Sequence, residues 1–371
     1  MTGFERVGPI EDEWRRLAVE RGNAFLTPEW SRAWFDTAGR DQEPVIVAAT
    51  RPGGSLAGVM PLSFDPKLRP RALRFAGAPF GDRFGVAAAR EDEDELAVAA
   101  IAALEGADAP STLLLHRIGV ESEWPARMQL ASRRRLALLE LSRDRLPYAR
   151  VAGLDWEGYL RGRSQKFRQR IGRGLDRAVE REGIEKRVRQ TSAAAELDGD
   201  MNALFALHDL RRSDRASSIS EHDVRRFLVE FARAALDRSW LRLRILELGR
   251  APAAAYLAWR IGGSYSLYQG GFDPAWSEQS AGLLLLNDTV RAAIGERVDE
   301  VDLLLGDEPY KWRFAPEPRE VRTVALVGAA HPARALLSFE AGLRRRGRGM
   351  ASRPLVGGVA RWVSRRLPGS G

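Results

Sequence analysis

The chain of 371 residues contains no cysteine. Disulfide bonds, thiolate nucleophiles and cysteine-based zinc sites are therefore excluded. Histidine is also scarce, and the few that occur do not have the spacing of metal ligands. A metal-dependent enzyme is therefore not expected. The histidines are His116, His208, His222 and His331.

Long apolar runs are missing as well. The first residues contain no apolar segment behind a basic start, so no secretory signal is predicted. No uncharged apolar run approaches the roughly 18 residues that a membrane-spanning helix needs. We therefore expect a soluble, cytoplasmic protein.

Three common catalytic motifs are absent. The sequence has no Gly-x-Gly-x-x-Gly after a strand and no Gly-Lys-Ser/Thr phosphate loop, which argues against nicotinamide and ATP chemistry. It has no Gly-x-Ser-x-Gly elbow, so a serine hydrolase is not supported. An ordinary apolar share of 44% nevertheless indicates folded domains, and the length suits two of them.

The positive charge is concentrated at the C-terminal end. Residues 331–371 hold nine arginines and one acidic residue, 9 − 1 = +8, which equals the net charge of the whole chain. Apolar residues recur at helical spacing over 355–367 and lie next to Trp362 and several arginines. This pattern is typical of an amphipathic helix on an anionic membrane surface. It fits a disordered basic tail equally well.

The order of predicted elements divides the chain into two mixed α/β domains, over 1–152 and 153–330, followed by the basic tail over 331–371. In each domain a strand, a glycine-containing turn and a second strand follow one another. These hairpins cover 45–64 and 241–261, and they suggest a weak internal repeat. Two ordinary, unrelated hairpins remain the alternative.

The stretch from 298 to 312 is the most informative part of the chain. A Val- and Leu-rich strand over 298–305 ends at Gly306, which permits a sharp exit, and Pro309 suits the first turn of a helix. Sites in open α/β sheets tend to form at such strand ends. The ionisable groups held there are Asp302, Asp307, Tyr310 and Lys311. A capped strand end with a surface lysine is the alternative reading.

A second candidate site lies just before this strand. A predicted strand ends in Gln269-Gly270-Gly271, and a helix begins at Ser280-Ala281-Gly282 after a polar loop. Small residues let backbone N–H groups approach an anion at a helix start, where the helix dipole is also favourable. A pyrophosphate would fit here without a lysine. Plain capping of a buried helix by Ser280 is the alternative.

A basic helix is predicted over 164–182. An apolar stripe recurs every four residues, and Lys166, Arg170 and three further arginines form a second stripe roughly opposite. These cations suit a solvated helix face or the binding of an anionic substrate. Nucleic acid is disfavoured, because the body is near neutral and aromatic residues are not interleaved. In Leu207-His208-Asp209, His208 suits packing or capping, or less readily a general base.

Several of these blocks, taken in order, resemble one protein family. They include the stretch at 25–30, the basic helix and three later blocks: Tyr268–Asp273, Ser280–Leu284 and Val301–Lys311. Together they are similar to the CelD/BcsL-type branch of the GNAT acyltransferases, whose relatives include the tandem-domain Fem aminoacyl transferases. The resemblance covers about residues 25–325, and its last block is the most specific.

The resemblance implies two GNAT-like halves, of which the second binds acyl-CoA. The pyrophosphate would lie at Gln279, Ser280, Ala281 and Gly282, which depart from the usual family form by keeping one glycine. Tyr310 matches the phenol that protonates the leaving thiolate. Asp302 or Asp307 would orient the acceptor, and Lys311 would bind an anionic acceptor or phosphate. The further candidates for substrate binding are Gln269, Lys166, Arg170 and His208.

The predicted activity is therefore transfer of an acyl group, such as acetyl from acetyl-CoA, to an amine or hydroxyl, without a metal. The expected acceptor is a sugar, a polysaccharide precursor or a lipid-linked intermediate. A Fem-like transferase that uses aminoacyl-tRNA is one alternative, and the basic helix would suit it. A non-catalytic GNAT-fold module at the inner membrane face is another, since the usual loop glycines are missing.

Overall fold

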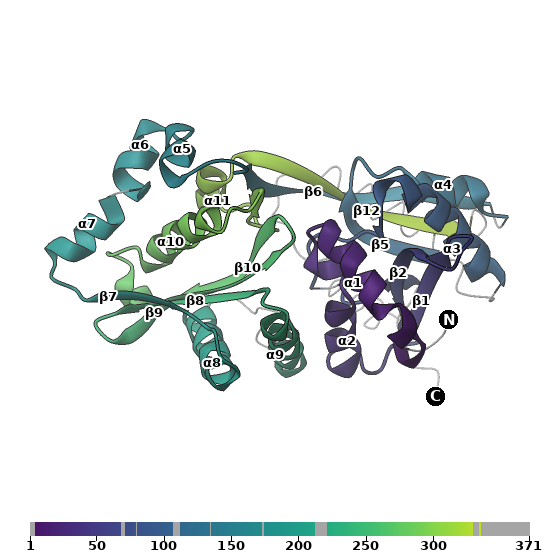
Figure 1. The fold of residues 1–371 in the computed structure, drawn as a ribbon, viewed down its shortest axis with the longest axis horizontal. Helices are drawn as coiled ribbons and strands as arrows, with labels where there is room; N and C mark the ends of the chain where they lie inside the picture. Colours follow the sequence, from purple (N-terminus) through teal and green to yellow (C-terminus); the bar gives the residue numbers. More distant parts are fainter. Residues whose placement is uncertain are drawn as a thin grey trace, which may run out of the picture. The chain divides into compact units, whose positions relative to one another are not determined.

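The computed structural model describes residues 4–328, apart from 68–70, 79, 107–111, 134, 173 and 212–220, together with Arg334. The predicted basic tail lies outside these residues. The chain forms two compact units (Figure 1). The N-terminal unit comprises residues 1–21, 25–144 and those from 320 onward, and the C-terminal unit comprises 22–24 and 145–319. Within the described ranges, no helix is long and apolar enough to cross a membrane.

The N-terminal unit has a mixed sheet in the order β1-β2-β3-β5-β12-β6, with β4 beside β2. Its strands are β1 (Glu43–Thr50), β2 (Leu56–Phe64), β3 (Leu73–Phe75), β4 (Ala87–Ala88), β5 (Thr112–Gly119), the start of β6 (Leu136–Arg150) and most of β12 (Glu317–Gly328). Its helices are α1 (Glu11–Glu20), α2 (Pro28–Asp36), α3 (Glu93–Gly106) and α4 (Trp124–Ala131). Thr27 caps α2, because its side chain accepts a hydrogen bond from the amide of Trp30.

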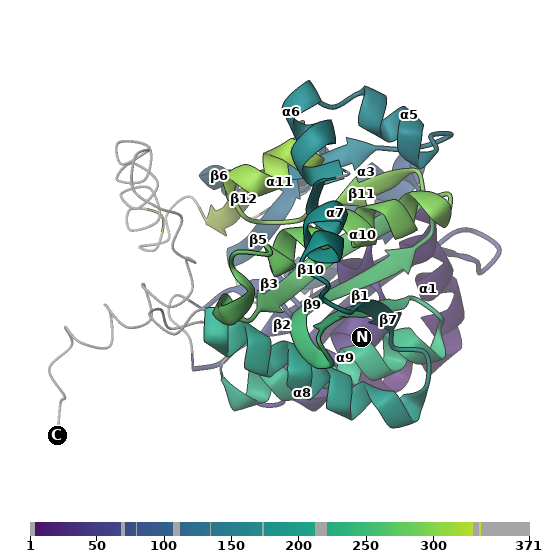
Figure 2. The same ribbon diagram turned by 90° about the vertical axis from the view of Figure 1, so that its left-hand side faces the viewer.

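The C-terminal unit has the strand order β7-β8-β9-β10-β11-β6. Its strands are β7 (Lys186–Gln190), β8 (Leu241–Leu248), β9 (Ala251–Ile261), β10 (Ser264–Phe272) and β11 (Glu300–Asp302). Its helices are α5 (Trp156–Arg161), α6 (Gln165–Phe167), α7 (Gly174–Arg181), α8 (Ala194–Arg211), α9 (His222–Asp237), α10 (Ala281–Gly295) and α11 (Pro309–Phe314). Helices α8 and α9 cover one face of the sheet and α10 covers the other (Figure 2).

The two units share a local topology. In each, a hairpin is followed by a third antiparallel strand, a helix and then a strand parallel to the third. The helix and parallel strand are α3 and β5 in the N-terminal unit, and α10 and β11 in the C-terminal unit. The mixed α/β fold expected from the sequence is confirmed, and both hairpins of the suggested repeat are present.

The compact units divide after Asp144, and the described residues 320–328 belong to the N-terminal unit. Two elements have other ends than expected. The strand expected over 298–305 is only Glu300–Asp302, because the chain turns away at Leu303. The helix expected over 164–182 is interrupted by a π-helical turn at Arg168–Gly172. At Gly174, an added Cβ would overlap the carbonyl of Gln169, so the backbone there is too tight for a side chain.

Burial of His116 on β5 makes the stability of the N-terminal unit depend on pH. The residue is only 4% exposed. Burial lowers the pKa of His116 to about 3, and the charges of Arg74 and Arg117 add to this effect. In the unfolded chain this imidazole therefore binds a proton near pH 6.5, whereas in the folded chain it does so only near pH 3.

As the pH falls from 6.5 towards 3, this histidine should cost up to about 1.4 kcal/mol of unfolding free energy per pH unit. Urea unfolding of the wild type and His116→Leu at several pH values between 4 and 7.5 measures the effect. The two curves should diverge below pH 6.5, because leucine removes the proton uptake of the unfolded state. Parallel curves would show that His116 is not the cause.

Candidate active site

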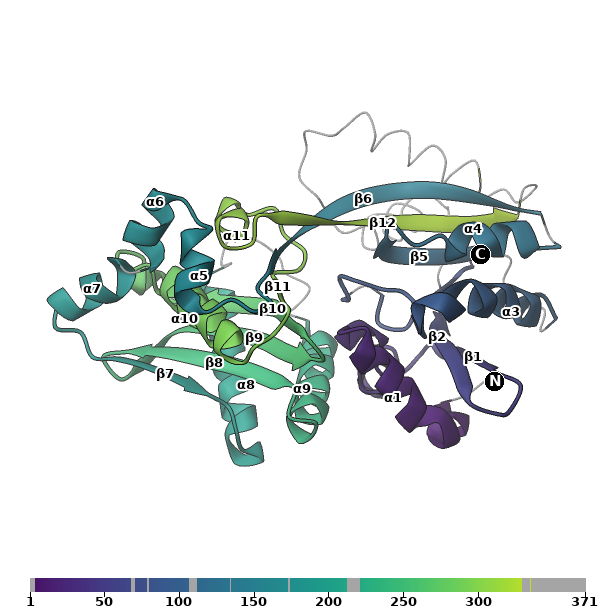
Figure 3. The same ribbon diagram turned by 45° about the horizontal axis from the view of Figure 1, so that its top comes forward.

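The site begins where β10 and β11 separate. A β-bulge at Tyr268 shifts the register of β10 against β9. On its other side, β10 pairs with β11 only over Ser264–Ser266, although β10 continues to Phe272. Figure 3 shows β11 beside β10 and β6. The amide of Leu303 donates to the carbonyl of Pro147 on β6, so the chain leaves β10 at this point.

Asp302, the last residue of β11, is fully buried and ion-paired with Arg319. Its other oxygen accepts a hydrogen bond from the amide of Leu304, at 2.9 Å. Burial lowers the pKa of the Arg319 guanidinium. The negative charges of Asp302 and Glu300 have the larger combined effect, so the pKa is raised overall. Asp302 therefore fixes the turn that follows β11, and its charge is already neutralised by a partner.

The turn after β11 has an unusual backbone. Leu304 is buried in the left-handed region with φ of 53°, and the Asp302 carboxylate holds its amide there. At Gly306, φ is 138°, and an added Cβ would overlap the side chains of Glu308 and Lys311. Only glycine suits this position, because both the space and the backbone conformation exclude a side chain.

Lys311 lies inside this turn. Its Nζ donates to the carbonyl of Leu305 at 2.7 Å and lies 3.6 Å from Oε2 of Glu308. Asp307, in contrast, is exposed, and its Oδ1 accepts a hydrogen bond from the Trp312 indole at 3.0 Å. Of the two predicted acids, Asp302 is thus buried in an ion pair, and Asp307 faces solvent beside an aromatic ring.

Tyr310 lies at the centre of a group that we call the Tyr310 cluster, defined as Tyr310, Tyr256, Arg211 and Glu308. The Tyr310 phenol lies close enough to Tyr256, Arg211 and Glu308 for each of them to influence its pKa. Burial raises the pKa of Tyr310, the Glu308 carboxylate raises it further, and Arg211 opposes the increase. Burial likewise raises the pKa of Tyr256. Both phenols therefore remain protonated at neutral pH.

Arg211 joins the cluster to β10. It lies at the end of α8, and its Nη1 donates to the carbonyl of Gly270 at 3.3 Å. Its Nη2 lies 3.8 Å from Oε1 of Glu308, and its guanidinium lies over the Phe272 ring. Among the described residues, no group donates a hydrogen bond to the other carboxylate oxygen of Glu308, Oε2, which is buried and lies 3.6 Å from Nζ of Lys311.

The two glycines of β10 explain how these side chains meet. Gly270 pairs with Tyr256 across the ladder, and an added Cβ would overlap the Tyr256 ring. At Gly271 an added Cβ would overlap the backbone of Leu207 and His208, so α8 packs directly on β10. His208 is accordingly buried at this helix contact, and Gln269 is half-buried beside the bulge.

Because backbone atoms cannot move aside as a flexible side chain can, Gly271→Ala should push α8 away from β10. We expect a loss of about 1–3 kcal/mol in unfolding free energy, measured by urea denaturation. Gly295→Ala is the control, because Gly295 ends α10 with no atom near its added Cβ. Equal stability of the two variants would contradict the close packing of α8 and β10.

The start of α10 has the small residues expected from the sequence. In the part of the chain that the structure describes, the amides of Ala281 and Gly282 have no acceptor. Ser280 adopts the left-handed conformation, and its side chain caps nothing, unlike the capping alternative. Gln279 donates from Nε2 to Glu182 at 2.8 Å, which also brings a carboxylate to this helix start.

Comparison with known families bears on this part of the chain. Residues 165–312 match the model of the acetyltransferase (GNAT) domain. The match includes the bulged β10, α10, β11 and all four residues of the Tyr310 cluster. No curated protein matches the chain.

Solved structures share the fold of the GNAT-matching segment and extend beyond it. A structure of FemX is 9% identical with a TM-score of 0.63, covering 88% of this chain and 98% of that one. The C-terminal domain of a putative lysylphosphatidylglycerol synthetase from Agrobacterium fabrum is 12% identical with a TM-score of 0.58, covering 91% and 96%. L-PGS from Bacillus licheniformis is 11% identical with a TM-score of 0.50, covering 86% and 97%. At these identities the likeness concerns the fold.

The basic stripe lies at the start of the GNAT-matching segment. Phe167, Ile171 and Val179 are buried as the apolar stripe predicted, and the ring of Phe167 packs against Phe314. Lys166 and Arg170 are exposed, and no ion pair involves them among the described residues. They do not contact the Tyr310 cluster, so the predicted site residues are divided between this cluster and a basic surface.

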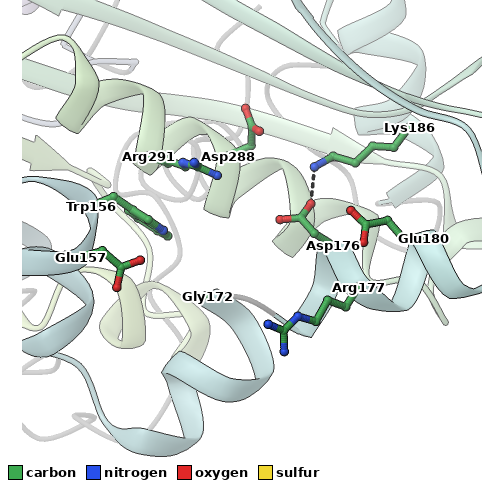
Figure 4. A pocket seen from close by; sticks show the side chains of 9 residues that line it. All are labelled: Trp156, Glu157, Gly172, Asp176, Arg177, Glu180, Lys186, Asp288 and Arg291. Atoms are coloured by element: carbon green, nitrogen blue, oxygen red, sulfur yellow. Dashed lines mark hydrogen bonds and ion pairs between the residues drawn. The ribbon is translucent and has the colours of Figure 1, made fainter.

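A surface cavity of about 470 Å³ also lies in the C-terminal unit (Figure 4). Its lining contains none of the predicted site residues. Three of its charged residues are already neutralised, because Lys186 pairs with Asp176 and Asp288 pairs with Arg244. The residues that line it are Trp156, Glu157, Gly172, Asp176, Arg177, Glu180, Lys186, Asp288 and Arg291. Among the described residues, no group of three acidic or histidine side chains forms a metal site.

Sequence reasoning missed Tyr256, Arg211 and Glu308 as site residues. Glu308 lies within the stretch Val301–Lys311, the most specific block of the family resemblance. In the sequence, the glycine pair at 270 and 271 suggests only the end of a strand. A glycine pair inside a strand is a signal for close approach of another group. The glycine pair therefore predicts close packing on both faces of β10, but it does not identify the residues that pack there.

Proposed function

We propose that the protein is an acyl-CoA-dependent N- or O-acyltransferase of the GNAT type, with the Tyr310 cluster as its reacting centre. The observation that carries the proposal is the half-buried Tyr310 phenol beside Glu308 and Arg211, at the point where β10 and β11 separate. The GNAT match over residues 165–312 supports the reaction class. Like a transferase site, the cluster offers both a proton donor and a proton acceptor.

Glu308 and Tyr310 divide the proton transfers between them. The acceptor nitrogen or oxygen attacks the thioester carbonyl, and its proton passes to Oε2 of Glu308, which accepts no hydrogen bond from the described residues. The carbon–sulfur bond then breaks, and the leaving thiolate takes the proton of the Tyr310 phenol. Lys311 and Arg211 hold Glu308 between them as an anion. Asp302 positions the turn, and Asp307 is available to orient the acceptor.

The start of α10 is the proposed position of the CoA pyrophosphate. The amides of Ala281 and Gly282 would donate to it, and the helix dipole would favour its charge. Their small side chains leave the backbone accessible, which supports the assignment. The Glu182 carboxylate bound by Gln279 opposes an anion there, so Gln279 would have to exchange Glu182 for the ligand.

The proposed acceptor is a sugar, a polysaccharide precursor or a lipid-linked intermediate, as the CelD/BcsL-type resemblance implies. The exposed cations Lys166 and Arg170 would attract an anionic acceptor. The basic tail, which lies outside the described residues, remains the proposed contact with an anionic membrane surface. A peripheral position on the inner membrane face follows from that proposal.

An aminoacyl-tRNA donor is the second candidate. The fold shared with FemX and with the lysylphosphatidylglycerol synthetase domain supports it. The observation that favours it is the Gln279–Glu182 contact, because a carboxylate at the α10 start disfavours a pyrophosphate. In this case Lys166 and Arg170 would bind RNA phosphates.

A thiol-release assay separates the two donors. Purified protein is incubated with acetyl-CoA and a panel of amino sugars, sugar nucleotides and lipid-linked saccharides, and free CoA is measured. Acceptor-dependent release of CoA is the expected result. Transfer from charged tRNA to the same acceptors, without CoA release, would support the second candidate and contradict the first.

A further inference from the structure

Tyr256 on β9 covers β10 with its side chain, as part of the Tyr310 cluster. It pairs directly with Gly270 in the β9–β10 ladder, and its ring lies over the glycine so closely that a Cβ there would overlap ring carbons. The residue is 6% exposed and belongs to the core cluster that includes Leu284 and Leu285 of α10. The ring therefore fills the space between α10 and β10 at this position.

The position of the Tyr256 hydroxyl shows how the Tyr256 side chain lies relative to the proposed reaction. This hydroxyl lies near the Tyr310 phenol, because Tyr310 packs against the same core cluster and influences the pKa of Tyr256. The proposed function places the Tyr310 phenol within hydrogen-bond reach of the leaving sulfur, so the Tyr256 side chain borders the group that touches the thioester. Whatever is attached to the thioester carbonyl has to fit beside the Tyr256 ring.

The residues around the ring are small. The neighbours of Tyr256 on the same face of β9 are Ala254 and Ala258, both fully buried, and Gly270 lies opposite. On this face of β9, Tyr256 is therefore the large side chain among small neighbours. A smaller residue at 256 would open a space lined by alanine and glycine, and that space would point from Tyr310 into the core between α10 and the sheet.

We propose that Tyr256 sets the length of the acyl group and restricts the donor to acetyl-CoA or a comparably short acyl-CoA. This inference rests on the proposed function. The Tyr256 ring excludes additional methylene groups. Tyr256 is thus a specificity-determining residue that acts through steric exclusion.

Calorimetric titration with CoA, acetyl-CoA, butyryl-CoA and hexanoyl-CoA tests this without knowledge of the acceptor. The wild type should bind acetyl-CoA at least about tenfold more tightly than hexanoyl-CoA, since a single methylene in a fitted pocket is worth that much. Tyr256→Leu should reduce the difference to about threefold or less, because it removes the ring. Tyr256→Phe is the matched control, which keeps the ring and should keep the wild-type preference.

The outcomes distinguish this inference from the proposed function. Equal affinity of the wild type for all three thioesters would overturn the role of Tyr256 and leave CoA-dependent transfer intact. Absence of binding by CoA and by every thioester would overturn both. Should Tyr256→Leu fail to fold, the wild-type affinities and those of Tyr256→Phe still decide: a preference for acetyl-CoA supports the inference, and no preference overturns it.

Discussion

Replacing Tyr310 with phenylalanine should lower kcat about 100-fold, while the affinity for acetyl-CoA changes by less than about threefold. The ring that packs against the C-terminal core stays in place, and only the hydroxyl is lost. That hydroxyl is the proposed proton donor to the leaving thiolate. Because burial and Glu308 raise the pKa of Tyr310, the phenol holds its proton at the pH of the assay.

Steady-state kinetics of CoA release and calorimetry of acetyl-CoA binding together measure this effect. Tyr148→Phe is the matched control, because the Tyr148 hydroxyl accepts a hydrogen bond from Arg150 on β6 and takes no part in the Tyr310 cluster. Its kcat should remain close to that of the wild type. An unchanged kcat in Tyr310→Phe would exclude Tyr310 as the acid, whereas loss of acetyl-CoA binding would indicate a structural role.

Replacing Asp302 with alanine should cost about 1–3 kcal/mol of unfolding free energy, because the half-buried Arg319 loses a fully buried counter-ion and keeps only Glu300. It also removes the acceptor that holds the amide of Leu304 in its left-handed turn. Asp302→Asn keeps an acceptor for that amide and loses only the charge, so its cost should be smaller.

Urea unfolding measures these costs, and a surface ion pair provides the comparison. Asp198 pairs with Arg233 at 3.0 Å, but its side chain is 68% exposed. Asp198→Ala should therefore change the unfolding free energy by less than about 1 kcal/mol. If Asp302→Ala is no less stable than Asp198→Ala, then Asp302 does not hold the turn, and its predicted catalytic role regains support.

Local patterns in the sequence predicted much of the C-terminal fold. Glycine at 262 and 263 separates two apolar strands, and both β9 and β10 form. The expected β–α–β unit is confirmed, since β11 runs parallel to β10 after α10. Such elements follow from apolar periodicity and turn residues, which are properties of neighbouring positions in the chain.

The composition of the site could not be read in this way. Arg211 ends a helix far from Glu308 in the chain, and the two meet only because α8 packs on Gly271. The end of β11 was misjudged for a similar reason, because Leu303 and Leu304 suit a strand locally. The Asp302 side chain instead holds the amide of Leu304 in a left-handed turn. Specific contacts override local propensity at both positions.

The most direct test of the account is calorimetric titration of the full chain with acetyl-CoA at neutral pH. A saturable signal with one site per chain, lost or strongly weakened when a large acidic side chain is placed at the α10 start in Gly282→Glu, is the predicted result. Gly282→Ala should bind nearly as well, because its added Cβ meets only the edge of the Phe272 ring. No heat of binding up to millimolar acetyl-CoA, from a protein shown to be folded, would contradict the assignment as an acyl-CoA-dependent transferase.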